Sequence, residues 1–184
     1  MSEEERKKGF LPLFNGKNLD NWRVVGNDVW RVENGTLVCR GSGRSWIRPV
    51  KKYRNFILRL EYKLDKNCNS GIFIRTSEEG RPAFAGMEIQ LIDDYGKPPG
   101  KRSTGAIYAA IAPSKNVNNP AGQWNRIQIT ADGPSIKVLL NGAESVDDEP
   151  GTPLKDRLTE GYIGLQNHGE PPAAYFRNIR IKEL

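Results

Sequence analysis

Residues 30–39 read WRVENGTLVC, in which two short apolar-rich runs lie on either side of an Asn-Gly pair at 34–35. An Asn-Gly pair readily adopts the two positive φ values of a type I′ turn, so this stretch predicts a β-hairpin. A second Asn-Gly pair, at 141–142, follows the apolar-rich run Ser135–Leu140 and marks a further turn. These signals favour a fold built from short antiparallel strands.

The rest of the chain has the same character, with short, partly alternating runs separated by turn residues. The 19 Gly and 12 Pro are consistent with frequent turns. A helical pattern occurs only in the short stretch Pro153–Leu158. Many short strands indicate a sandwich or a barrel. We expect two stacked antiparallel sheets whose first and last strands lie close together. The other runs that predict strands are Phe56–Leu64, Gly71–Thr76, Met87–Ile92, Gly105–Ala110, Asn125–Thr130, Tyr162–Gln166 and Tyr175–Ile181.

The length of 184 residues fits one domain that buries a core without disulfides or metal. The first eight residues, MSEEERKK, predict a flexible N-terminal tail, and residues 9–184 predict a single β-sandwich domain. The two cysteines, Cys39 and Cys68, have no metal-type spacing, and the sequence leaves open whether they pair. A mean hydropathy of −0.63 describes a polar but foldable chain.

The charge pattern excludes several classes of partner. The net charge is +6, but acidic residues lie among the basic ones and no basic stripe forms, so we expect no nucleic-acid binding. No apolar run of about 18 residues is present, so we expect no membrane insertion. The first residues lack the apolar core of a signal peptide, although a removed leader replaced by a start Met would give the same sequence.

Side-chain alternation sorts each predicted strand into a core face and an outer face. If the Ile and Leu residues point inward, the polar side chains of four strands share the outer face. Phe73 lies on the same face. An ordinary wet face of an antiparallel sheet remains the alternative. However, planar groups that hydrogen-bond and stack suit hydroxyl and carbonyl ligands. The polar members of this face are Arg75, Glu88, Gln90, Tyr108, Gln166 and His168, the last being the only histidine of the chain.

Two loops follow these strands and are candidates for the rim of a site. They are residues 93–101, beginning with Asp93, and residues 112–115, ending with Lys115. The adjacent acids Asp93 and Asp94 are too few for a calcium site, which needs six to eight oxygens. No His/Cys cluster supports zinc, so we expect neither a metal nor a cofactor.

Several motifs, in order, resemble the 3-keto-disaccharide hydrolase (DUF1080) family from Gly9 nearly to the C-terminus. No single motif is specific, but their shared order is. The matching stretches are GFLPLFNGKNLDNW at 9–22, WRVENGTL at 30–37, NSGIFIR at 69–75, EIQLIDD at 88–94, GAIY at 105–108, PAGQWN at 120–125, GLQNHG at 164–169 and FRNI at 176–179.

This resemblance implies a jelly-roll sandwich of the concanavalin A-like lectin and glucanase type. It also implies bacterial carbohydrate metabolism, usually periplasmic or extracellular, and cleavage of sugars already oxidised to a ketone at C3. The run Glu88-x-Gln90-x-x-Asp93 departs from the Glu-x-Asp-x-x-Glu strand of jelly-roll glucanases. Since ordinary glycosidases need two well-placed acids, this departure argues against their chemistry.

These residues suggest a hypothesis in which the C3 ketone acidifies the C2 proton and the C1 substituent is then eliminated, followed by hydration. His168 or Glu88 would be the base, Arg75 would hold the enolate oxygen and Tyr108 would protonate the leaving group. The substrate, a small carbohydrate, would be bound by Gln90, Gln166, Asp93, Phe73 and Lys115. The alternatives are a non-catalytic, lectin-like carbohydrate-binding module of the same fold and a structural or adhesion domain.

Overall fold

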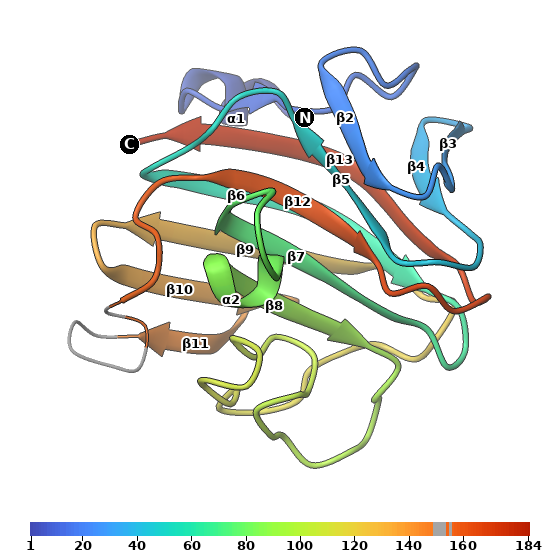
Figure 1. Ribbon diagram of the computed structural model, residues 1–184. Helices are drawn as coiled ribbons and strands as arrows, with labels where there is room; N and C mark the ends of the chain where they lie inside the picture. The colour runs from blue at the N-terminus through green and yellow to red at the C-terminus, as the bar shows by residue number, and fades with distance from the viewer. Residues whose placement is uncertain (149–153, 155) are drawn as a thin grey trace.

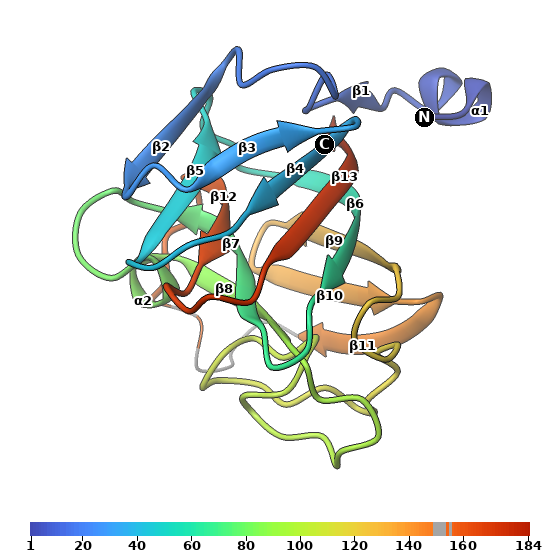
Figure 2. The same cartoon turned by 90° about the vertical axis from the view of Figure 1, so that its right-hand side faces the viewer.

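The computed structural model describes residues 1–148, 154 and 156–184, and its strands form two stacked antiparallel sheets (Figure 1; Figure 2). The elements are α1 (Glu3–Lys7), β1 (Leu11–Pro12), β2 (Trp22–Gly26), β3 (Trp30–Glu33), β4 (Thr36–Cys39), β5 (Ser45–Pro49), β6 (Phe56–Leu64), β7 (Asn69–Thr76), α2 (Pro82–Ala85), β8 (Met87–Ile92), β9 (Asn125–Asp132), β10 (Ser135–Leu140), β11 (Ala143–Asp148), β12 (Tyr162–Asn167) and β13 (Ala174–Glu183). The larger sheet has the order β11-β10-β9-β6-β13-β4-β3, with β1 on β13, and the smaller has the order β2-β5-β12-β7-β8. The predicted sandwich is confirmed.

Both turns indicated by Asn-Gly pairs are confirmed. β3 pairs with β4, and β10 pairs with β11, each through a two-residue connection. Asn34 and Gly35 have φ values of 48° and 75°, and Asn141 and Gly142 have φ values of 51° and 82°. The local sequence therefore sets the register of both hairpins, because a type I′ turn matches the twist of the strands that it joins.

The core lies between the two sheets and follows the predicted alternation. In β6, every second side chain from Phe56 to Leu64 is buried. Trp30 and Phe176 pack there with ring centroids 6.3 Å apart, and both are fully buried. Cys39 and Cys68 are also buried and free, and burial raises the pKa of each thiol to about 12.

The two ends of the chain meet on the larger sheet, as expected. β1 pairs with β13 through Leu11 and Ile181. The first eight residues differ from the expected flexible tail, because Glu3–Lys7 form a helix capped by Ser2. The Glu5 carboxylate anchors this helix by accepting hydrogen bonds from Arg180, at 2.7 Å, and Arg59, at 3.1 Å.

Two predicted elements differ in the structure. Residues 105–110 form turns rather than a strand, although Tyr108 N donates to Glu88 O at 2.8 Å and so follows the edge of β8. In the helical pattern at Pro153–Leu158, residues 153 and 155 lie outside the described part of the chain, and none of the described residues 154 and 156–158 is helical. Strands β2 and β5 were not predicted from the sequence. Within the described residues, no helix is long and apolar enough to cross a membrane.

Candidate functional site

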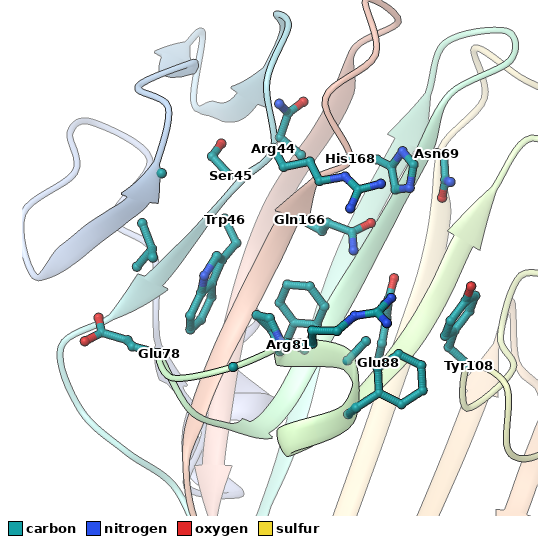
Figure 3. Close-up of a pocket in the computed structure, with 18 of the residues that line it drawn as sticks. Arg44, Ser45, Trp46, Asn69, Glu78, Arg81, Glu88, Tyr108, Gln166 and His168 are labelled. Atoms are coloured by element: carbon teal, nitrogen blue, oxygen red, sulfur yellow. The ribbon is translucent and has the colours of Figure 1, made fainter.

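A cavity of about 440 Å³ opens on the face of the smaller sheet that is turned away from the core (Figure 3). This volume falls within the range of about 300–1,000 Å³ that small-molecule sites occupy. Helix α2 forms part of its walls, together with the residues Arg44, Glu78, Gly80, Arg81, Tyr108 and His168. Strands β5, β7, β8 and β12 supply the floor, which consists mainly of Trp46, Asn69, Phe73, Glu88, Gln90 and Gln166.

Two glycines in the middle of the floor strands make room for larger neighbours. A Cβ atom at Gly71 would lie 2.3 Å from Glu88 Oε1, and one at Gly164 would lie 2.3 Å from Trp46 Cε3. Both distances are far shorter than a van der Waals contact. Glycine at these two positions therefore lets the Glu88 carboxyl and the Trp46 ring lie flat against the sheet.

Glu88 is a buried carboxyl at the edge of this floor. The residue is only 4% exposed, and burial raises its pKa from 4.5 to about 7, a shift that a hydrogen bond from Gln166 opposes. When the Gln90 amide is oriented to satisfy both of its ends, its nitrogen donates to Glu88 Oε1 at 3.2 Å and to Ser70 O at 3.1 Å. Near neutral pH, this carboxyl can therefore both accept and release a proton.

His168 lies at the rim of the cavity and is paired with a carboxylate. Its Nδ1 atom is 3.0 Å from Glu170 Oε1, and the side chain is 31% exposed. A carboxylate at this distance favours the tautomer that carries the proton on Nδ1 and leaves Nε2 as a hydrogen-bond acceptor. His168 can therefore accept a proton from a group in the cavity.

Two cations and an unpartnered amide oxygen add polar character to the cavity. Figure 3 shows Arg44 and Arg81 extending into it from opposite walls. Neither guanidinium has an ion-pair partner in the part of the chain that the structure describes, whereas Glu78 accepts a hydrogen bond from Arg48 at 2.6 Å. The Gln166 Oε1 atom is buried and accepts no hydrogen bond from any described residue. The cavity thus offers several donors and one open acceptor to a polar ligand.

Comparison with known proteins identifies the family. The model of the 3-keto-alpha-glucoside-1,2-lyase-like domain matches residues 9–182. The chain belongs to this family. A protein of Bacteroides thetaiotaomicron described as a 3-keto-disaccharide hydrolase is 26% identical and aligns with 96% of this chain and 79% of its own length. The family resemblance seen in the sequence motifs is therefore confirmed, and it supports a carbohydrate-active role.

Solved structures agree with the fold expected for this lyase-like family. A candidate glycosyl hydrolase from Parabacteroides distasonis is 30% identical with a TM-score of 0.87, over 100% of this chain and 98% of that one. The carbohydrate-binding module CBM66 from Bacillus subtilis is 14% identical with a TM-score of 0.64, over 89% of this chain and 96% of that one. The second likeness shows only that the two proteins share the jelly-roll architecture.

The structure brings together most of the predicted site residues of this family member. These are Phe73, Glu88, Gln90, Tyr108, Gln166 and His168, all of which line the cavity. Glu88 and His168 lie on the same face of the sheet, as side-chain alternation predicted. Tyr108 reaches the cavity from a turn rather than from a strand.

Arg75 does not belong to the site, and its predicted role is wrong. Its backbone has a φ of 49°, and the pairing of β12 with β7 shifts register nearby, so the alternation stops before this residue. The guanidinium is directed away and donates to Arg54 O and Gly133 O, both at 2.7 Å, and to Asn55 Oδ1 at 3.1 Å. Arg75 is thus a buried structural residue, 2% exposed.

Asp93 and Lys115 also lie outside the cavity. Asp93 Oδ2 accepts a hydrogen bond from Asn67 N at 2.9 Å and so ties the connection between β6 and β7 to the end of β8. Lys115 is exposed in a loop that Ser114 attaches to the larger sheet by donating its backbone N–H to Ser145 O at 2.7 Å. Among the described residues, no group of three His, Cys, Asp or Glu side chains is placed to hold a metal ion.

Sequence analysis missed the arginines and one large aromatic residue of the cavity. Trp46 lies on β5, which was not predicted, and its ring meets Phe73 edge-to-face with centroids 5.6 Å apart. Arg44 and Arg81 lie in loops, whose folded positions alternation does not predict. One usable signal was present: Gly164 interrupts an apolar run and Gly71 begins one, and glycine in a strand often marks the close approach of another group.

Proposed function

We propose that this protein cleaves 3-keto-glycosides in the cavity by proton abstraction at C2, elimination of the C1 substituent and hydration. The observation that carries the proposal is Glu88, a buried carboxyl with a pKa of about 7, in a cavity that is also lined by Arg44 and Arg81, two arginines that form no ion pair with any carboxylate of the described residues. A general base works best when its pKa is near the operating pH. Family membership supports the same class of substrate.

The chemistry begins at C2. The ketone at C3 makes the C2–H bond acidic, and the base takes this proton while the bonding electrons move to form a C2–C3 enolate. The enolate then re-forms the ketone and expels the oxygen substituent at C1, which receives a proton from an acid. The products of this step are an enone with a C1–C2 double bond and a free alcohol. Water then adds its oxygen to C1 and a proton to C2, giving the 3-keto sugar.

We assign the roles from the placement of the side chains. Glu88 is the base for C2, since burial strengthens its affinity for a proton. Arg81 replaces Arg75 as the group that pairs with the enolate oxygen, because Arg75 lies elsewhere. Tyr108 protonates the leaving oxygen, and the amides of Gln90 and Gln166 bind sugar hydroxyls.

His168 is assigned to the hydration step. Its Nε2 atom, left as an acceptor by the contact between Nδ1 and Glu170, is suited to take a proton from the attacking water. This assignment gives removal of the C2 proton to Glu88 and deprotonation of the attacking water to His168. The sequence alone left the base open between these two residues.

Direct displacement at C1 is disfavoured by the same set of residues. Retaining and inverting glycosidases use two carboxyl groups that flank the scissile bond. The second carboxylate that lines the cavity, Glu78, is engaged by Arg48. The neighbour of Glu88 on the same face of β8 is the amide Gln90, which cannot act as a nucleophile or acid.

The test is to incubate the protein with a 3-keto-glycoside and with the matching unoxidised glycoside in deuterated water. We expect cleavage of the keto compound alone, with deuterium at C2 of the product. Cleavage of the unoxidised glycoside at a comparable rate, without deuterium at C2, would instead indicate a conventional glycosidase. Binding of the keto compound without any turnover would indicate a carbohydrate-binding module.

A further inference from the structure

One aromatic side chain of the cavity wall is held in an exposed position. Phe84 in α2 is 39% exposed and lines the cavity. The other large apolar side chains that are exposed in the described residues lie outside the cavity: Met1, Leu11, Val50, Tyr95, Leu158 and Leu184. Scattered exposed apolar residues need no explanation, but one that faces a ligand cavity is a candidate contact for the ligand.

The segment that carries Phe84 is firmly attached to the sheet. Thr76 Oγ1 donates to Pro82 O at 2.8 Å, and the Arg157 guanidinium donates to Phe84 O. Gly86 ends the helix against the backbone of β7, where a Cβ atom would lie 2.4 Å from Ile74 O. These contacts fix the backbone of Phe84 from both sides of the helix.

The ring itself is also oriented. It meets the Tyr108 ring edge-to-face with centroids 6.2 Å apart, and the Arg81 Cζ atom lies 4.8 Å from its centroid. These contacts cover little of the Phe84 ring but restrict it to one orientation. Phe84 therefore presents a preorganised apolar surface next to the tyrosine that we assign as the acid.

We propose that Phe84 is the platform for the leaving group and makes the protein favour C1 substituents that carry a ring over small alkyl substituents. The inference rests on the proposed function and adds the residue that discriminates between its leaving groups. The atom that Tyr108 protonates is the oxygen between the two groups, so whatever is attached to that oxygen extends past Tyr108. Phe84 is the aromatic ring that contacts Tyr108 there.

The remaining aromatic residues of the floor suit the other half of the substrate. Trp46 and Phe73 lie on β5 and β7, with Gly164 between them on β12. The keto ring then lies against this part of the floor, next to Glu88 on β8. The leaving group occupies the end of the cavity that Phe84 and Tyr108 line.

The test compares three substrates: methyl 3-keto-glucoside, phenyl 3-keto-glucoside and a 3-keto-disaccharide. Phe84→Ala should lower kcat/KM about fivefold to tenfold for the phenyl and disaccharide substrates and leave the methyl substrate within about twofold of wild type. Using the ratio to wild type for each substrate removes the intrinsic difference in leaving-group reactivity. Phe84→Trp should retain activity on all three, and Phe84→Leu should recover only part of it.

Two controls separate this proposal from the chemistry. Tyr95→Ala, at an aromatic residue that is 60% exposed outside the cavity, should change none of the three ratios. Wild-type turnover of the methyl substrate tests the elimination independently of Phe84. If no substrate turns over, calorimetry can measure the affinity of wild type and Phe84→Ala for unoxidised phenyl and methyl glucosides. The variant should bind phenyl glucoside more weakly than wild type does and bind methyl glucoside equally well. Equal losses on all substrates, or no loss on any, would overturn the proposal.

Discussion

The Glu88 carboxyl lies directly over the backbone of Gly71 on the neighbouring strand, where a Cβ atom would come within 2.3 Å of its Oε1 atom. This contact explains how a charged side chain at the edge of the sheet becomes nearly inaccessible to water. The glycine permits the close approach, the approach excludes solvent, and the loss of solvent raises the pKa of Glu88 to about 7. A residue without a side chain thus tunes the proposed base.

Gly71→Ala should separate activity from folding. The three atoms nearest to the added methyl group are Oε1, Cδ and Cγ of the Glu88 side chain and none belongs to the backbone, so we expect a melting temperature within about 5 °C of wild type. Because a small misplacement of a catalytic group is costly, kcat/KM should fall roughly a hundredfold. Gly100→Ala is the matched control, since its Cβ atom would meet only Ser103 Oγ, at 3.8 Å. Full activity in Gly71→Ala would show that the placement of Glu88 does not matter.

The raised pKa of Glu88 also predicts how stability depends on pH. Below about pH 4.5 the group is protonated in both the folded and unfolded states and has no effect. Between pH 4.5 and 7 the unfolded chain loses this proton while the folded protein keeps it, so the free energy of unfolding falls as pH rises. Above pH 7 the accumulated loss is about 3 kcal/mol.

Glu88→Gln should remove this dependence. We expect the variant to be more stable than wild type at pH 8 and similar at pH 4, as measured by urea unfolding at both values. In wild type, kcat/KM should rise as pH increases through about 7, because the base must lose its proton. A parallel pH profile of stability in wild type and variant would show that Glu88 titrates normally.

Arg75 and Arg81 should behave in opposite ways. Arg75→Met removes the three hydrogen bonds that the buried guanidinium donates, so the free energy of unfolding should fall by about 2–4 kcal/mol while the folded fraction keeps its kcat. Arg81→Gln should leave stability nearly unchanged and lower kcat by about 100-fold to 1,000-fold, the typical cost of losing an oxyanion donor. Denaturant unfolding and steady-state kinetics on both variants check this contrast. A lower kcat in fully folded Arg75→Met would indicate that Arg75, and not Arg81, pairs with the enolate oxygen.

The contrast shows where prediction from the sequence ends. Alternation placed Glu88, Gln90 and Gln166 on one face correctly, because regular pairing preserves the two-residue period. The same rule failed two residues after Phe73, since one residue with positive φ at the end of β7 redirects the Arg75 side chain. Nothing in the run GIFIR at 71–75 signals that change.

The residues that form the walls of the cavity could not be predicted from the sequence for a different reason. Arg44 and the segment that carries Arg81 and Phe84 lie far apart in the chain, and tertiary contacts bring them to the site. Phe84, for example, depends on a bond from Arg157, which follows it by 73 positions. Propensity and turn chemistry describe each segment alone and do not predict such contacts.

The assignment of the base can be decided by hydrogen exchange at C2. In deuterated water, wild type should exchange the C2 hydrogen of a 3-keto-glycoside, and Glu88→Gln should slow this exchange by about a hundredfold or more, since the amide cannot accept the proton. His168→Asn should keep the exchange and the release of the alcohol but accumulate the enone, because its role is assigned to hydration. Glu170→Gln should give a milder form of the same result, as the amide no longer fixes the tautomer through Nδ1. Exchange and alcohol release are followed by NMR, and the enone by its ultraviolet absorbance. If exchange stops in His168→Asn and persists in Glu88→Gln, the two residues have the reverse roles.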